Sequence, residues 1–499
     1  MIDRRGFIKS AGLFGISALF ADKLWSVQAQ GEVIRVRPNI NSVMGNAEYM
    51  GAYRKGVALM KSRPDNDPTS WMYWANVHYM LAAMPEDMKG IWNQCEHSTD
   101  KFLPWHRAYI YFFEHVLRDA TGFDGFNIPY WDWYTDPVLP SVFREPKEDN
   151  PLWHPRGKTA NSGESLDPGR NLERSMWSSD TNQLIGGNSF SEKMERDPHG
   201  DMHTRVGQGL IAGVPGRFDM GSIRTSAKDP VFWLHHANID RLWTVWSKMG
   251  SGRTNPSPAS AWSDSRFTFD KAMTQQYVAG NLVDSESSMK YHYDNESPVS
   301  TTPPPLRPPV IASSGSTASS GGMTPMASGH KVMSNVNPVS LALESGTVRM
   351  SIPAAQSNTL GMQVQGQSPA GKITSLMLYI EGMKLTSLGE EIGASYKIFL
   401  NLPTSSSADA YEAHYLGTIN SFEFSVQSAH TEAHGGGGGE DKGITLRYQL
   451  LNRLAKLGNK AWDKESIFIS FVTPVELKVA GPLVEITGMR IESSDLPTE

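Results

Sequence analysis

Six histidines in the first half of the chain have the spacings of metal ligands. His199 and His203 are four residues apart in the stretch DPHGDMHTR, so a helix there would present both imidazoles on one face, within reach of one ion. Two groups of three imidazoles without a thiolate-rich site suit zinc, copper, nickel or iron. The alternative for each histidine is an ordinary hydrogen-bonded place in the core. The two groups are His78, His97 and His106, and His199, His203 and His236.

Three stretches with apolar residues three and four positions apart are the expected helices that position these side chains. They are SWMYWANVHYMLAAM (70–84), WHRAYIYFFEHVLRDATG (105–122) and FWLHHANIDRLWTVWSKMG (232–250). Gly122 and Gly250 are the expected ends of the last two, because glycine is favoured just past a helix. In the third stretch His235 and His236 are adjacent, so on a helix they point about 100° apart and cannot serve one centre equally.

The composition excludes several classes of protein. The 499 residues carry a formal net charge of -6 and no basic stripe, so nothing indicates a nucleic-acid partner. The single cysteine, Cys95, excludes an intrachain disulfide. A hydrophobic content of 39% with 10% aromatic residues is typical of a globular protein with a sizeable core.

The N-terminus has the features of an export signal. Arg4 and Arg5 form a twin-arginine pair, and a modest apolar stretch follows over residues 11–21. The pattern is that of a bacterial twin-arginine signal, whereas the alternative is an amphipathic N-terminal helix. We therefore expect residues 1–30 to be a signal and the protein to be periplasmic or extracellular. No other segment approaches the length and apolar character of a membrane span.

The composition changes after residue 295. Residues 296–334 are rich in Pro, Ser and Gly and are expected to be a linker. It would separate a metal domain over 31–295 from a β-rich domain over 335–499. The alternating segments TVRMSI, KITSLMLYIEGM, SYKIFLNLP, SFEFSV, SIFISFVTP and VEITGMRIE are expected strands of a β-sandwich. ITLRYQLLNRLAKLG (444–458) is an expected helix that ends at Gly458.

Four longer motifs resemble those of the type 3 copper polyphenol oxidases, the family of the tyrosinases and catechol oxidases. They are HSTDKFLPWHRAYIYFFE (97–114), IPYWDW (128–133), MGSIRTSAKDP (220–230) and DPVFWLHHANID (229–240). The resemblance covers residues 35–250 and implies a mainly α copper domain, a four-helix bundle that carries a dinuclear copper site. The C-terminal part is similar to the β-rich C-terminal domain of latent plant members of the family, which implies a β-sandwich.

The resemblance implies two copper ions and assigns the six histidines to them. His78, His97 and His106 match the ligands of the first copper, and His199, His203 and His236 match those of the second. In the adjacent pair the family's ligand is His236, and His235 lines the site. Asp240, one turn beyond His236, is expected to support the ligands or pack between helices. The alternative for Asp240 is a surface ion pair with Arg241.

Cys95 stands two residues before His97 in the stretch QCEH. Several members of the family have a cysteine at this spacing that forms a covalent thioether to the second ligand of the first copper. Such a link would restrict the rotamers of His97. The alternative is a buried, inert thiol.

The resemblance implies oxidation of o-diphenols to o-quinones with dioxygen, and in some members an initial monooxygenase step on monophenols. Glu195 matches a glutamate that helps to hold a water as base, but Gly200 stands where strong monophenolases often have Asn. We therefore expect diphenolase activity to exceed monophenolase activity. Ile223 aligns with a Phe that gates the copper in many plant enzymes, so its smaller side chain would admit bulkier phenols; the alternative is a plain core residue.

In the family, a C-terminal domain of this kind covers the active site until it is displaced or removed, so we expect latency here. The expected partner is a small phenolic substrate, with a copper chaperone as a further candidate. Two other functions remain open on the same ligands: oxidation of o-aminophenols, and dioxygen carriage like that of the hemocyanins.

Overall fold

The computed structural model describes residues 33–80, 83–145, 149–166, 171–177, 182–186, 189–211, 214–250, 252–269, 277–297, 330–336, 339–342, 346–352, 354–367, 373–403, 413–420, 422, 424, 443–458, 466–472 and 481–494. The chain divides into two compact units. The helical unit runs to His199 and from Ile223 to Thr301, and the β-rich unit comprises Gly200–Ser222 and Thr302–Glu499. In the part of the chain that the structure describes, no helix is long and apolar enough to cross a membrane. The expected export signal and most of the expected linker lie outside the described residues.

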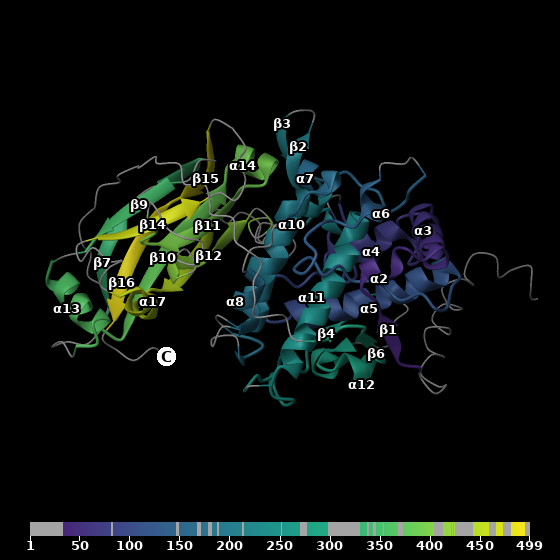
Figure 1. Ribbon diagram of the computed structural model, residues 1–499, viewed down its shortest axis with the longest axis horizontal. Helices are drawn as coiled ribbons and strands as arrows, with labels where there is room; N and C mark the ends of the chain where they lie inside the picture. The colour runs from purple at the N-terminus through teal and green to yellow at the C-terminus, as the bar shows by residue number, and fades with distance from the viewer. Residues whose placement is uncertain are drawn as a thin grey trace, which may run out of the picture. The chain divides into compact units, whose positions relative to one another are not determined.

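Three long helices dominate the helical unit (Figure 1). They are α3 (Ala47–Lys61), α5 (Phe102–Thr121) and α11 (Pro230–Lys248), and α5 packs against the other two. The remaining helical segments are α2 (Ile40–Val43), α4 (Trp71–His78), η1 (Glu86–Met88), α6 (Ser141–Arg144), α7 (Lys158–Ser162), α8 (Asn171–Trp177), α9 (Phe190–Met194), η3 (Glu195–His199), η5 (Ser226–Lys228), η6 (Ala279–Leu282) and α12 (Ser285–Met289). Two strand pairs complete this unit: β1 (Arg35–Arg37) runs parallel to β6 (Tyr291–Tyr293), and β4 (Arg266–Phe267) runs antiparallel to β5 (Tyr277–Val278).

The long helices lie where the sequence predicts, although α5 begins at Phe102 and α11 at Pro230, ahead of the expected starts at Trp105 and Phe232. The side chain of Asp229 accepts a hydrogen bond from the Val231 amide at the start of α11, and Pro230 occupies its first turn. α5 ends at Gly122, which adopts the left-handed conformation with φ 68°. These ends fix the registers of the two helices that carry His106 and His236.

α4 is shorter than the sequence predicts. It ends at His78, and Tyr79 is already extended. The carbonyls of Asn76 and Val77 accept hydrogen bonds from the amides of Asn93 and Gln94, both at 3.0 Å, so they are not available to continue the helix. The expected helix over 70–84 is therefore wrong in its second half, and the loop that ends α4 also leads toward His97.

Large aromatic side chains fill the core of the helical unit. Trp233 of α11 stacks on Phe113 of α5 with 3.3 Å between ring centroids. Trp71 of α4 packs edge-on against both rings. All three side chains are almost fully buried, and such aromatic contacts are directional as well as apolar.

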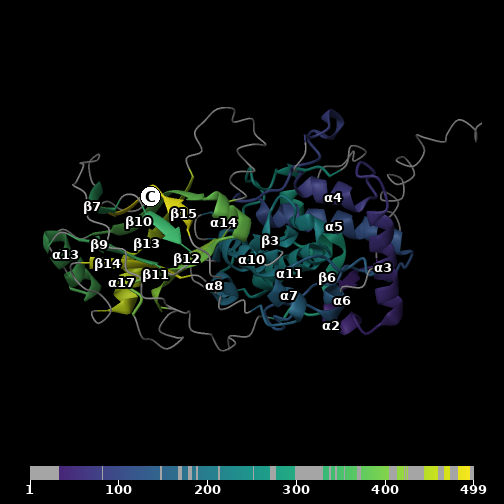
Figure 2. The same ribbon diagram turned by 90° about the horizontal axis from the view of Figure 1, so that it is seen from above.

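The β-rich unit starts with α10 (Gly200–Gly207), the hairpin of β2 (Gln208–Ile211) and β3 (Val214–Arg217), and η4 (Asp219–Gly221). Two antiparallel sheets follow. One has the order β7-β16-β10-β15-β8 with β13 also paired to β10, and the other has the order β12-β11-β14-β9. Strands of both sheets are labelled in Figure 2. The strands are β7 (His330–Val336), β8 (Val339–Ala342), β9 (Gly346–Ser351), β10 (Ser375–Leu385), β11 (Ser395–Leu400), β12 (Tyr415–Asn420), β13 (Ile444–Gln449), β14 (Ser466–Val472), β15 (Pro482–Ile486) and β16 (Gly488–Ser494); the helices are α13 (Ala354–Val364), α14 (Ser387–Ile392) and α17 (Leu451–Leu457).

The two sheets share one aliphatic core, as a β-sandwich requires. Leu378 and Ile380 of β10 come from one sheet, and Ile398 of β11 and Ile467 of β14 come from the other. All four are fully buried in the same cluster. The predicted fold class, a helical domain followed by a β-sandwich, is confirmed.

Three local predictions for the sandwich are wrong. The first half of the expected helix over 444–458 is the strand β13, because Leu446 and Tyr448 alternate inward while the backbone pairs with β10. Only Leu451–Leu457 is helical, and it ends before Gly458. In the expected strand SFEFSV, the two described residues, Phe422 and Phe424, are helical. Strand β7 begins at His330, inside the range expected for the linker.

Candidate metal centre

The first histidine group forms a buried cluster. His78 is the last residue of α4, His97 lies in the loop before α5, and His106 lies in the second turn of α5. One ring nitrogen from each lies within 4.8 Å of the others. None of the three side chains is more than 2% exposed. The structure therefore brings together three side chains that are far apart along the sequence.

The second group forms a similar cluster with one additional member. His199 ends the π-helical turn η3, His203 follows in α10, and His235 and His236 are adjacent in α11. Ring nitrogens of all four lie within 4.8 Å of one another, and all four side chains are fully buried. The sequence predicts that His235 lines the site without binding copper. In the structure its ring nitrogen lies as close to the three predicted ligands as they lie to one another, within 4.8 Å.

Backbone carbonyls orient three of these imidazoles. Nδ1 of His106 lies 2.8 Å from the Phe102 carbonyl, and Nδ1 of His199 lies 3.0 Å from the Glu195 carbonyl. Nδ1 of His203 lies 2.8 Å from the carbonyl of Met220. A carbonyl can only accept, so Nδ1 carries the proton and a neutral ring presents Nε2 as a lone-pair donor. The Nε2 atoms of these rings are therefore available as neutral metal ligands, so the donor set fits a pair of copper ions.

The two clusters lie next to each other. The rings of His106 and His236 are stacked with centroids 4.5 Å apart and an interplanar angle of 10°. The rings of His97 and His199 are also stacked, at 5.7 Å. Each cluster therefore contributes rings that lie against the other, which is the arrangement that a dinuclear centre needs.

Apolar rings surround the clusters and keep bulk water away. Phe232, one turn before His236, lies 4.2 Å from the His236 ring and 5.0 Å from the His78 ring. Phe102 lies 4.8 Å from the ring of His199. Both phenylalanines are fully buried, so charges and dipoles at the centre act in a low-dielectric surround.

Glu195 connects the two clusters. Its carbonyl accepts from His199, and its carboxylate accepts a hydrogen bond of 2.6 Å from the backbone amide of Ser98, the residue after His97. Ser98 has a positive φ of 55°, which is uncommon for a residue other than glycine. The half-buried carboxylate thus lies beside the centre and holds the loop that carries His97.

Cys95 is a partly buried free thiol. Burial raises the pKa of this thiol, and the nearby carboxylates of Glu96 and Glu195 raise it further. The proton therefore stays on sulfur near neutral pH. The thioether to His97 stays a prediction. Ile223 is fully buried, and its role as a gate also stays a prediction.

Gly200 is buried where α10 begins, within the β-rich unit. A Cβ atom at this position would lie 2.7 Å from Nδ2 of Asn420, the last residue of β12. The neighbouring Phe422 stacks on the ring of His203 with centroids 4.1 Å apart and an interplanar angle of 19°. Sequence analysis missed Phe422 and Asn420, because neither is a typical metal ligand and neither lies in one of the four motifs.

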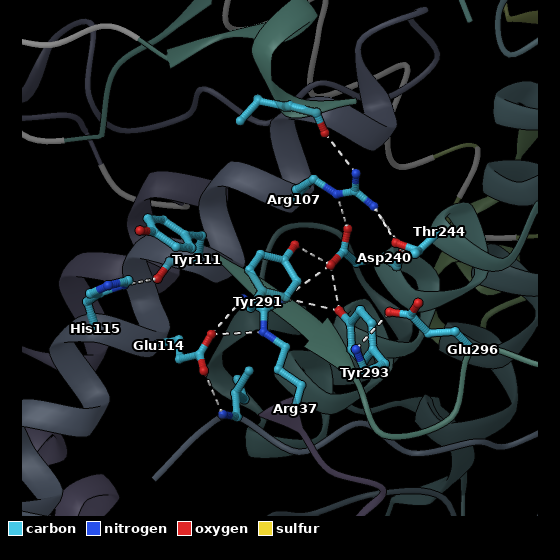
Figure 3. Close-up of polar contacts among 12 residues, drawn as sticks. Arg37, Arg107, Tyr111, Glu114, His115, Asp240, Thr244, Tyr291, Tyr293 and Glu296 are labelled. Atoms are coloured by element: carbon cyan, nitrogen blue, oxygen red, sulfur yellow. Dashed lines mark hydrogen bonds and ion pairs between the residues drawn. The ribbon is translucent and has the colours of Figure 1, made fainter. Parts of the chain in front are cut away.

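Asp240 belongs to a buried ion-pair network (Figure 3). Its carboxylate pairs with Arg37 at 3.0 Å and with Arg107, the residue after His106. The alternative prediction for Asp240, a surface ion pair with Arg241, is therefore wrong. Arg241 instead pairs with Asp132 at 3.4 Å. Sequence reasoning missed Arg37 and Arg107. A charged Arg107 within the apolar stretch FLPWHRAYIYFF was the available signal.

Known proteins are similar to this chain in sequence and in fold. A family model described as the common central domain of tyrosinase matches residues 68–182 and 158–249. A tyrosinase of Hahella sp. (strain CCB-MM4) is 30% identical over 299 residues, and a chloroplastic polyphenol oxidase of Malus domestica is 30% identical over 270 residues. These matches cover 50% and 47% of this chain but only 61% and 44% of those relatives. The solved structure of latent apple tyrosinase has the same fold, with a TM-score of 0.58 at 21% identity over 93% of this chain and 98% of that one.

Proposed function

Because the chain belongs to the tyrosinase and polyphenol oxidase family of type 3 copper proteins, we propose that it oxidises o-diphenols to o-quinones with dioxygen. The observation that carries the proposal is the adjacency of the two buried histidine clusters, with the rings of His106 and His236 face to face at 4.5 Å. When bound, a copper pair supplies the redox chemistry that reduces dioxygen and oxidises the phenol.

The protein's own groups bind and orient the reactants. His78, His97 and His106 would hold one copper, and His199, His203 and His236 the other, all as neutral imidazoles. Phe232 excludes water and offers an apolar ring beside the centre.

Diphenols should be better substrates than monophenols. A monophenol must lose its proton before it is hydroxylated, and Glu195 is the nearby carboxylate that could hold a water for this step. That carboxylate already accepts from the Ser98 amide, and Gly200 has no side chain to hold the water from the other side. These two features support a diphenolase with weaker monophenolase activity.

Copper content and oxidation of a simple catechol test the proposal together. We expect two coppers per chain and turnover of catechol well above that of the matching monophenol. Comparable turnover of the two would contradict the diphenolase preference. Two coppers without catechol oxidation would instead direct the search to o-aminophenols or to reversible dioxygen binding. Zinc, or no metal, would contradict the function itself.

Latency is the second part of the proposal. Phe422 stacks on His203, one of the proposed copper ligands, and Asn420 lies against Gly200 beside it. Phe422 comes from the C-terminal part of the chain and is 2% exposed. A ring in this position would compete with a phenol for the face of the second copper site. Cleavage of the expected linker over 296–334, or mild SDS, should therefore raise catechol turnover, and unchanged turnover would contradict latency.

Two further properties are proposed from the sequence. The twin-arginine pair would export the folded, copper-loaded protein, so replacing Arg4 and Arg5 by Lys should retain it in the cytoplasm of a bacterial host. The thioether between Cys95 and His97 would lower the intact mass by two hydrogens and protect Cys95 from alkylation after unfolding. A freely alkylated Cys95 in the copper-loaded protein would contradict the thioether.

A further inference from the structure

Asp240 accepts hydrogen bonds from three different directions while it is almost completely buried. Its Oδ2 accepts from Arg37 at 3.0 Å, from the Tyr291 hydroxyl at 2.6 Å and from the Tyr293 hydroxyl at 2.5 Å. Its Oδ1 accepts from Nε of Arg107. The carboxylate at the centre of Figure 3 is therefore held on all sides, with no freedom to rotate.

Arg107 is held just as firmly. Besides Asp240 Oδ1, its guanidinium donates to the Asp240 carbonyl at 3.2 Å and to the Thr244 hydroxyl at 2.9 Å. It also donates to the carbonyls of Leu282 and Val283, at 2.8 and 3.0 Å. All five N–H groups of the side chain are thus used, and the guanidinium lies 3.8 Å from the centre of the Trp243 ring. Two of these acceptors are on Asp240 and one is on Thr244, so Arg107 binds two successive turns of α11.

The contact between Arg107 and Asp240 lies beside two of the predicted copper ligands. Arg107 directly follows His106 in α5, and Asp240 lies one helical turn after His236 in α11. The His106 and His236 rings are the pair that meet face to face, at 4.5 Å. The contact between Arg107 and Asp240 therefore ties α5 to α11 next to the point where the two histidine clusters meet.

Glu114 is a natural control for Asp240, because it is also a buried carboxylate bonded to guanidinium groups but lies farther along α5 from His106. It is also buried, and it accepts from Arg37 at 2.6 and 2.8 Å and from Arg118 at 2.9 Å. Arg37 and Arg118 lie in β1 and in α5 itself. Glu114 thus stabilises the same network through β1 and α5, and the contacts described for it do not tie α5 to α11.

We propose that Asp240 is a positioning residue that fixes the separation of the two copper ions, by tying the turn of α5 next to His106 to the turn of α11 next to His236. The inference rests on the copper pair of the proposed function. Two cupric ions held close enough to interact magnetically cancel each other's spin, so the fraction of copper that EPR detects measures how well the separation is kept.

The experiment compares Asp240→Asn with Glu114→Gln in the full-length, copper-loaded, oxidised protein. Copper per chain, thermal unfolding and the EPR-detectable fraction of copper are measured for each. Both variants should unfold at lower temperature, because each leaves buried guanidinium groups beside a neutral partner. We expect Asp240→Asn to show an EPR signal from more than about half of its copper, whereas Glu114→Gln stays as silent as the unmodified protein.

Two results would overturn the proposal. One is an Asp240→Asn protein that binds two coppers and remains EPR-silent, and the other is a Glu114→Gln protein with an equal signal. If Asp240→Asn does not fold, Arg107→Lys takes its place, because it keeps the charge but loses the planar fork; it should show a smaller signal in the same direction, and silence would again overturn the proposal. An unmodified protein without two coppers would show that the proposed function has failed, which is a separate outcome.

Discussion

The cores of the two units are packed in different ways. The helical unit buries ion pairs, including Asp240 with Arg37 and Arg107, and Asp229 with Arg156. The described part of the β-sandwich is held mainly by a large, mostly aliphatic cluster between its two sheets. Hydrogen-bonded ion pairs are directional, whereas aliphatic contacts depend mainly on volume and area.

This difference follows from what each unit must do. A dinuclear centre requires ligands from separate helices at fixed separations, and directional contacts beside His106 and His236 restrict how the helices can move. The sandwich holds none of the six predicted copper ligands, so its core requires stability, which apolar packing provides. The comparison predicts that changes to the buried charges that join α5 and α11 beside His106 and His236 should affect the centre, while small changes in the core of the sandwich should affect stability alone.

The largest effect is expected from His106→Ala. Removing one of three imidazoles should reduce copper from two ions per chain to one and lower catechol turnover by more than about a hundredfold, since even loss of a group that supports a ligand costs about 10–100-fold. His115→Ala is the matched control, because His115 lies on the same helix and its Nδ1 also faces a backbone carbonyl, that of Tyr111. Copper analysis and turnover would be measured for both. Two tightly bound coppers in His106→Ala would contradict the ligand assignment.

Asp229→Asn should cause the largest loss of stability. Asp229 starts α11 and makes a two-fold contact with Arg156 at 2.7 Å, with both side chains fully buried. Removing the charge leaves the guanidinium without its counter-ion and should cost about 3–5 kcal/mol of unfolding free energy. Chemical denaturation followed by tryptophan fluorescence measures this loss. Asp264→Asn changes an exposed aspartate by the same substitution and should cost less than about 0.5 kcal/mol; equal losses would show that the buried pair has no special weight.

Acid should weaken the helical unit through three carboxylates. Burial alone would raise the pKa of each, but neighbouring guanidinium groups outweigh burial and lower the pKa. A lowered folded-state pKa stabilises the fold above the unfolded value of about 4 and loses this stabilisation as pH falls through the folded value. Stability should therefore be flat with respect to these groups above about pH 5 and fall below about pH 4. The carboxylates are Glu114, Asp229 and Asp240.

Tryptophan fluorescence during acid titration tests this, because all tryptophans among the described residues lie in the helical unit. In Asp229→Asn the fall below pH 4 should be shallower, since one titrating group is gone. A loss of stability that begins near neutral pH would contradict the assignment to these carboxylates.

Much of this architecture could be predicted because its signals are local. The spacing of His199 and His203 and the end of α5 at Gly122 follow from residues within one or two turns. The early end of α4 could not be predicted in this way. It depends on the amides of Asn93 and Gln94, which reach the α4 carbonyls only in the folded chain.

The partners of Asp240 could not be predicted for the same reason. Arg37, Arg107 and Tyr291 come from three separate elements, and the contact distances depend on how those elements pack. The sequence pattern of β13 also had two interpretations, since leucines at 446, 450 and 454 suit a helix. Pairing with β10 favours a strand for its first half, which is a contact between residues far apart in sequence.

Phe422→Ala tests whether the β-rich unit covers the centre. The aromatic contact with His203 is worth about 1 kcal/mol beyond its buried area, so its loss should raise catechol turnover by up to about tenfold in the absence of SDS or protease. Phe399→Ala is the control: Phe399 packs against Tyr415 in the same unit, as part of a small cluster with Val472. It should lower stability without raising turnover. An equal rise in both variants would mean that general loosening of the unit, not the Phe422 ring, activates the enzyme.

The smallest effect is expected from Ile398→Val in the sandwich. Ile398 of β11 is fully buried among aliphatic neighbours, so removing one methylene should cost about 0.5–1.5 kcal/mol of unfolding free energy. Because no directional contact is lost, the copper content, the EPR-silent state and the turnover ratio of diphenol to monophenol should stay unchanged. Thermal unfolding would measure the loss of stability, and EPR would show whether the copper stays silent. An EPR signal in Ile398→Val would show that the sandwich, too, helps to set the copper separation, and the contrast between the two units would then be one of degree.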